Sequence, residues 1–180
     1  MEVSCARELY IYLALLLLVV PVRLLLAVVV SAVVHELFHI LAIRLIRIQI
    51  NSIHIAPRGA ILLTQPMNPK QELLCALAGP LGGFMLFLFF PWMPVISLVS
   101  ITHSLYNLLP LYPTDGGRIL HCLTQLACSA KVGGLIVYWV EAITLSLLIA
   151  LSVYCSVRIG FGIIPIIFGV SLLLRFAKRK

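Results

Sequence analysis

Charged residues are scarce in this sequence. They make up 11% of its 180 residues, whereas hydrophobic residues make up 62%. A soluble domain usually carries about a quarter charged residues, and a fold of this size could not bury so much apolar surface. The composition therefore argues against a soluble protein and predicts a single integral membrane domain over residues 1–180.

Other signatures are missing as well. Basic residues are not interleaved with aromatic ones, so the net charge of +7 does not indicate nucleic-acid binding. The five cysteines form no CxxC pair and are odd in number, so no disulfide framework is implied, and we interpret them as small packing residues. The first apolar run lacks a clear cleavage site, which favours a retained helix over a signal peptide.

Long hydrophobic runs fill most of the chain. A membrane-spanning helix needs about 20 apolar residues, and the runs are separated by prolines, glycines and charges. We expect six spans, at about 6–22, 24–45, 70–90, 95–111, 132–154 and 159–175. A shorter, less apolar helix is expected near 117–130. The predicted fold class is therefore an all-α polytopic membrane protein with about six transmembrane helices.

Residues 46–66 break this pattern. Isoleucines alternate there with polar residues, and Pro57-Arg58-Gly59 is a turn signal. Alternation of this kind is typical of β-strands. We therefore expect a short, membrane-associated β-strand segment after the second span.

Basic residues fall mostly on one side of this six-span topology. If both termini are cytoplasmic, only Arg23 and Arg158 of the 13 lysines and arginines lie outside. The positive-inside rule favours this orientation. We therefore predict a multi-pass membrane protein with both termini in the cytoplasm.

The segment VVHELFHI, residues 33–40, places three polar side chains in a very apolar run. His35 and His39 are four residues apart, so they project from one helix face, with Glu36 on its flank. HExxH on a helix is the zinc-hydrolase arrangement of two metal ligands and a general base. The alternative is a pair of core histidines with Glu36 as counter-ion. It is weaker, because ionisable groups in a bilayer are costly and usually functional.

A catalytic zinc site needs a third protein ligand. The candidates are the cysteines and His54, His103, His121, Glu72, Asp115 and Glu141. Asp115 is favoured, because it is the only aspartate and ends the fourth span among two prolines and two glycines, in NLLPLYPTDGGR. Irregular backbone at membrane depth is tolerated where it lines a cavity. The alternative role for Asp115 is to cap the helix that starts at Gly116.

HExxH in one span and N-x-x-P-x-x-P-x-D-G-G-R at the end of a later one resemble the site-2 protease family of intramembrane zinc metalloproteases. The order of features matches over about residues 30–120 and includes a helix with Ala78-Gly79-Pro80. The compact six-span form most resembles the SpoIVFB-type sporulation branch. We expect neither the CBS domain common in that branch nor the PDZ domain of other branches. Phe38 and Thr114 stand where many members have glycine and leucine.

The resemblance implies a zinc-dependent intramembrane endopeptidase. Its substrate would be a membrane-embedded or membrane-proximal segment of a regulatory protein, such as a sigma-factor precursor or anti-sigma factor, cut near the cytoplasmic face. The implied site residues are the zinc ligands His35, His39 and Asp115, the general base Glu36, and the substrate-binding Asn107 and Pro113. The implied location is the bacterial cytoplasmic membrane, where inhibitory membrane partners and a homo-oligomer are further expectations.

Several roles stay open at this stage. A metal-binding membrane protein or transporter without protease activity would keep the same ligands, and a catalytically silent scaffold is a further alternative. The strands near 48–63 fit either a structural hairpin or an edge for an extended substrate. His103, one turn before Asn107, fits a structural role better than support of a ligand. The substrate, its cleavage site, a role in sporulation and the oligomeric state do not follow from the sequence.

Overall fold

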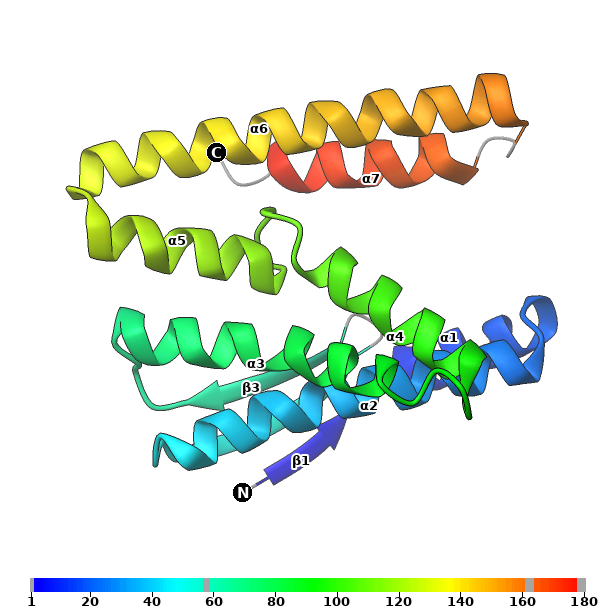
Figure 1. Cartoon of the computed structure of the whole chain (residues 1–180), viewed down its shortest axis with the longest axis horizontal. Coiled ribbons are helices and arrows are strands. Elements are labelled where there is room, and N and C mark those ends of the chain that lie inside the picture. The colour runs from blue at the N-terminus through cyan, green and yellow to red at the C-terminus, as the bar shows by residue number, and fades with distance from the viewer. Residues whose placement is uncertain (1, 57–58, 161–163, 178–180) are drawn as a thin grey trace.

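The computed structural model describes residues 2–56, 59–160 and 164–177. Helices and a small sheet make up most of this part of the chain (Figure 1). The strands are β1 (Glu2–Cys5), β2 (Ile50–Ala56) and β3 (Gly59–Thr64). The helices are α1 (Arg7–Val19), α2 (Val22–Leu45), α3 (Pro69–Phe87), α4 (Pro94–Asn107), α5 (Asp115–Ala127), α6 (Ala130–Tyr154), the π-helical turn η1 (Cys155–Ile159) and α7 (Ile164–Ala177).

The mostly helical fold and the strand segment after the second helix are confirmed, and the sheet has a third strand that was not predicted. β2 and β3 form an antiparallel hairpin, and β1 pairs with β2 in parallel. The order β1-β2-β3 leaves β3 at one edge of the sheet. The alternating residues Glu2–Cys5 are the sequence signal for β1, and they were overlooked because the apolar run beside them dominates the start of the chain.

Helices occupy the stretches predicted to be apolar spans, but the number of spans is not confirmed. Within the described residues, Val22–Leu45 and Ala130–Ile159 are the helices long and apolar enough to cross a membrane. α1, α4 and α7 have 13 or 14 residues each. At about 1.5 Å per residue, such helices are shorter than the roughly 30 Å hydrocarbon core of a bilayer.

α2 has a buried polar stripe and an exposed apolar face. Ala27, Ser31, His35, His39 and Ile43 are buried at the four-residue spacing of one helix face, and Leu25 is buried as well. The apolar side chains of Val29, Val33, Leu37 and Leu41 are exposed. Polar groups inside and apolar groups outside are what a helix surrounded by lipid requires.

Small residues bring α2, α3 and α4 close together. A Cβ on Gly82 would lie 2.8 Å from the Phe38 ring, and one on Gly83 would lie 1.9 Å from Ser104 Oγ. Glycine and serine at such contacts are typical of helix packing in membranes. α5 packs against α3 on one side and α6 on the other, and α6 and α7 run side by side as a separate layer (Figure 1). The α2–α5 group therefore forms the part of the fold that holds the predicted site.

Candidate metal centre

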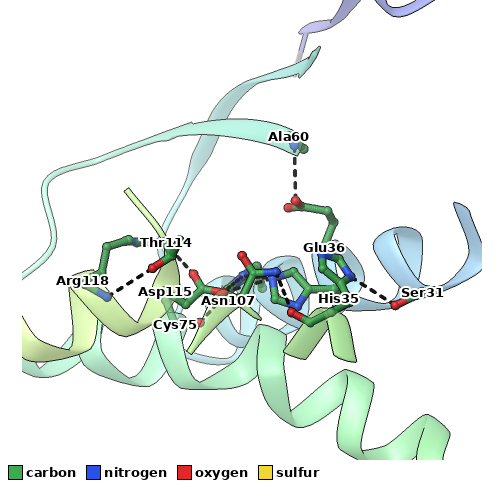
Figure 2. Close-up of polar contacts among 12 residues, drawn as sticks. Ser31, His35, Glu36, Ala60, Cys75, Asn107, Thr114, Asp115 and Arg118 are labelled. Carbon is green, nitrogen blue, oxygen red and sulfur yellow. Dashed lines mark hydrogen bonds and ion pairs between the residues drawn. The ribbon is translucent and has the colours of Figure 1, made fainter. Parts of the chain in front are cut away.

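His35, His39 and Asp115 meet at one point inside the protein. The Nε2 atoms of the two histidines are 3.1 Å apart, and Asp115 Oδ2 lies 3.0 Å from the Nε2 of His35 and 3.2 Å from that of His39. All three side chains are buried. α2 supplies the histidines and the start of α5 supplies the aspartate, so 76 residues of sequence separate His39 from its partner (Figure 2).

A backbone carbonyl orients His39. Its Nδ1 donates a hydrogen bond of 2.7 Å to the carbonyl oxygen of Cys75 on α3. Because a carbonyl only accepts, Nδ1 carries the proton and a neutral ring presents the lone pair of Nε2. A hydrogen bond at the far nitrogen is the usual way in which proteins orient an imidazole toward a metal.

Gly79 makes room for both rings. A Cβ at this position would lie 2.3 Å from His39 Nε2 and 2.7 Å from His35 Cε1. No real side chain tolerates such contacts, so any larger residue would displace the imidazoles. The glycine of the Ala78-Gly79-Pro80 stretch is therefore a requirement of the site.

Asp115 is not the cap of α5, so the alternative role considered for it is wrong. Thr114 is the N-cap, and its hydroxyl accepts from the Gly117 amide. The Asp115 carboxylate is thus free to turn toward α2. Cβ atoms on Gly116 and Gly117 would lie 2.1 Å from Leu108 O and 2.5 Å from Tyr112 N. The two glycines therefore let the loop after α4 pack directly on the first turn of α5.

The donor set fits a bound cation. Three ligand atoms converge with no other group between them, and Asp115 Oδ2 has no hydrogen-bond donor. In a tetrahedral zinc site with bonds of about 2.0–2.1 Å, ligand atoms stand about 3.3 Å apart, close to the separations found here. Without a cation, these electron-rich atoms would repel one another in a buried setting. Two imidazoles and a carboxylate, all buried, suit zinc.

Asp115 is held in its charged form. Burial alone would raise the pKa of this carboxyl, but the two histidines that face it outweigh burial and lower the pKa to about 2. The group is therefore a carboxylate at neutral pH, as a metal ligand must be.

Arg118 is a site residue that sequence reasoning missed. Its Nη1 lies 3.6 Å from Asp115 Oδ1, and its Nε lies 3.4 Å from Glu72 Oε1 on α3. The arginine thus faces the Asp115 oxygen that does not contact the histidines. Its position three residues after Asp115 on a helix was the available signal.

Glu36 is bound to the sheet in this structure. Its Oε1 accepts a hydrogen bond of 3.2 Å from the Ala60 amide of β3. Figure 2 shows the carboxylate pointing toward Ala60 and away from Asp115. The Ala60 amide points away from β2, because donors alternate between the two sides of an antiparallel strand. Glu36 therefore lies between the histidines and the free edge of β3.

The site opens into a cavity of about 380 Å³. Its walls include the metal-ligand cluster, Glu36 and Arg118. Both predicted substrate-binding residues, Asn107 and Pro113, also line it. So do five residues of β3, namely Gly59, Ala60, Ile61, Leu62 and Thr64. The structure therefore brings every predicted site residue to one cavity and adds a strand to its wall.

The other candidate ligands are not part of this cluster, although Cys75 lines the same cavity. His54 bonds to Ser4 within the sheet, and His121 is exposed on α5 beside Gln125. His103 lies behind His35, with ring centroids 4.9 Å apart, and its Nδ1 is 3.1 Å from Ser31 Oγ. Of the cysteines, Cys122 is buried in α5, and burial raises the pKa of its thiol, so it is no ready ligand.

Glu72 and Glu141 are not metal ligands either. Glu72 faces Arg118, and Glu141 accepts a hydrogen bond of 2.9 Å from the Tyr112 amide. Within the described residues, His35, His39 and Asp115 are the group able to hold a metal ion together.

Comparison with known proteins gives a sequence relative and a structural relative. No family model matches the chain. The zinc metalloprotease MJ0392 of Methanocaldococcus jannaschii is 29% identical over 108 residues, which cover 52% of this chain. The match spans about a third (32%) of that longer protein.

A structural relative is the site-2 protease from the same organism. Its solved structure matches with a TM-score of 0.65 at 20% identity, over 99% of this chain and 91% of that one. The chain therefore has the site-2 protease fold and is similar in sequence to an archaeal zinc metalloprotease over half of its length. It holds a buried His-His-Asp cluster where α2 meets the start of α5.

Proposed function

We propose that this protein is a zinc-dependent intramembrane endopeptidase. The observation that carries the proposal is the convergence of His35, His39 and Asp115, with Glu36 beside them, on one cavity. The shared fold and the sequence similarity to a zinc metalloprotease support it. A bound zinc ion, held by the three ligands, would supply Lewis-acid activation of water and of the scissile carbonyl.

The side chains around the ligands have distinct tasks. Glu36 takes a proton from the attacking water and returns it to the leaving amine, as a general base and then acid. Asn107 donates one amide hydrogen to the His103 carbonyl. Its second amide hydrogen is available to the substrate oxygen as negative charge develops there. Arg118 balances the charge of the Asp115 carboxylate.

The free edge of β3 is the proposed docking place for the substrate. A peptide bond inside a helix is shielded, so the substrate segment must unwind before it is cut. An extended segment can then pair with the edge strand, which lines the cavity and runs past Glu36 at Ala60. Pro113, in the loop between α4 and α5, lines the same cavity and would restrict how the segment lies across the ligands.

The protein is proposed to lie in the bacterial cytoplasmic membrane with both termini in the cytoplasm. α2 and α6 with η1 are long and apolar enough to span it, and the count of six spans is part of this proposal. Arg44 and Arg47 follow the histidines at the end of α2, on the side that the positive-inside rule assigns to the cytoplasm. Cleavage near the cytoplasmic face follows from this orientation.

The substrate class is proposed to be a membrane-anchored regulatory protein, such as a sigma-factor precursor or anti-sigma factor. The partners are therefore the bilayer and the substrate, and an inhibitory membrane partner or a second copy of the chain is compatible with the same site. Membership of the SpoIVFB-type sporulation branch is a hypothesis that rests on the compact six-span form.

The test compares wild type with Glu36→Gln, both reconstituted with single-span reporter proteins in liposomes. Gln keeps the size and one acceptor oxygen but cannot serve as the base. We expect cleavage to fall by about 10²–10⁴-fold, while zinc content by mass spectrometry stays unchanged. Undiminished cleavage by Glu36→Gln would overturn the proposal. Zinc binding by a wild type that cleaves no reporter would favour a metal-binding membrane protein or transporter instead.

A further inference from the structure

Glu141 is a buried carboxylate that the proposed mechanism does not use. It lies in the middle of α6 and is 4% exposed. An ionisable side chain within an apolar helix is costly, and in membrane proteins it usually has a specific partner. One of its partners here is a backbone amide and not a metal ligand. Glu141 Oε1 accepts a hydrogen bond of 2.9 Å from the backbone amide of Tyr112.

Tyr112 belongs to the loop between α4 and α5. This loop begins after Asn107 and ends at Asp115, so it joins two of the residues that line the cavity. The Tyr112 backbone also packs on the first turn of α5, since a Cβ on Gly117 would lie 2.5 Å from Tyr112 N and 2.8 Å from its Cα. Any shift of Tyr112 would therefore press on the turn that carries Asp115.

We propose that Glu141 is a positioning residue for the metal centre. It ties the loop to α6 and thereby sets the place of Asp115 relative to the two histidines of α2. A hydrogen bond to a carboxylate is stronger than one between neutral groups. Removing the acceptor would take this hydrogen bond from the Tyr112 amide, and the loop would lose its tie to α6. The inference rests on the proposed zinc site but not on proteolysis.

The consequence is that α6 takes part in the site although it supplies no ligand. α6 packs against α5 and forms a layer with α7, apart from the α2–α4 group (Figure 1). The Glu141–Tyr112 hydrogen bond joins this layer to the loop that lines the cavity.

The experiment uses three variants of the full chain in detergent micelles. Glu141→Leu removes the acceptor at similar volume, whereas Glu141→Gln retains an acceptor oxygen. Leu145→Ala is the matched control, because Leu145 is buried one turn further along α6 and lies outside the cavity. The readouts are zinc affinity by chelator competition and amide hydrogen exchange of residues 108–114 in the metal-free protein.

We expect Glu141→Leu to weaken zinc binding by about 10-fold, the lower end of the effect of groups that support metal ligands. Exchange of the Tyr112 amide should rise at least 10-fold in the same variant. Glu141→Gln should stay within about threefold of wild type in both readouts, and Leu145→Ala should match wild type in both even if its melting temperature falls.

Three results would overturn the inference. These are wild-type zinc affinity in folded Glu141→Leu, equal losses in Glu141→Gln and Glu141→Leu, or an equal loss of zinc in Leu145→Ala. If Glu141→Leu does not fold, the comparison of Glu141→Gln with wild type decides, and a tenfold loss of zinc affinity there counts against the hydrogen bond. A wild type that binds zinc but cleaves nothing removes the proposed activity and leaves this inference intact.

Discussion

α2 and α6 are the two described helices that could each cross a membrane, with η1 extending α6, and their roles differ. Their mean hydropathy is similar, yet 28% of the apolar window of α2 is buried inside the protein against 11% of that of α6. Both turn polar groups inward, which is the reverse of a soluble helix. α2 turns a row of ligands inward, whereas α6 turns a single carboxylate toward a backbone amide. Hydropathy therefore identifies both helices as possible membrane spans, but it does not show which of them supplies the metal ligands.

The largest expected effect comes from the ligands on α2. His39→Ala should abolish zinc retention and lower cleavage by at least about 10³-fold. Without zinc there is neither a Lewis acid nor an activated water for Glu36 to deprotonate. The measurement is zinc content together with reporter cleavage in liposomes. The control is His121→Ala, which truncates an exposed histidine of α5 and should change neither. Retention of zinc by His39→Ala would remove that residue from the ligand set.

The next effect compares a glycine beside α2 with one in α6. Gly79→Ala should weaken zinc binding by about 10–100-fold, because the new Cβ would lie 2.3 Å from His39 Nε2. A Cβ added at Gly134 would have no neighbouring atom within 4 Å. Alanine stabilises a helix relative to glycine by about 0.5–1 kcal/mol, so Gly134→Ala should bind zinc normally and melt no lower than wild type. Equal zinc affinities in the two variants would contradict the packing described here.

A smaller effect is expected at the edge of β3. The Leu62 amide should point to the free edge, on the same side as that of Ala60, and proline is tolerated where an edge amide faces outward. Leu62→Pro should raise KM for a reporter by about 10-fold with little change in kcat, because one strand-pairing hydrogen bond is lost. Leu62→Ala keeps the amide and is the control. An unchanged KM in the proline variant would favour a purely structural hairpin.

The smallest effect is expected at Arg118. Its side chain is 29% exposed and 3.6 Å from Asp115, so solvent screens the interaction. Arg118→Gln should lower zinc affinity by no more than about fivefold, measured by chelator competition. Arg44→Gln changes an exposed arginine at the end of α2 and should leave the affinity unchanged. A loss as large as that of Gly79→Ala would mean that Arg118 holds Asp115 in place.

The sequence predicted which side chains form the metal site, but not the contacts that orient them. HExxH fixes His35 and His39 on one face through helix periodicity alone, and a lone aspartate in irregular backbone was a strong third candidate. Nothing local reveals that Cys75 orients His39 or that Glu36 meets Ala60, since both contacts depend on how α3 and β3 pack. The strand β1 was missed because four residues carry a weak pattern beside a strong apolar run.

The span count shows a different limit. Apolarity predicts where helices form, but helix length depends on breaks such as Pro91 and Pro94. α4 therefore has only 14 residues, although its apolar run is longer. Glu141 is a further example, because its distance in sequence from Tyr112 hides the hydrogen bond between them.

The central claim is a buried zinc site made of nitrogen and oxygen ligands from α2 and α5. X-ray absorption at the zinc edge of purified Glu36→Gln tests it most directly, because this variant should keep the metal. The expected spectrum shows four nitrogen or oxygen neighbours at about 2.0–2.1 Å, with the scattering pattern of two imidazoles. A sulfur neighbour at about 2.3 Å, or protein free of zinc after zinc is supplied, would contradict the account.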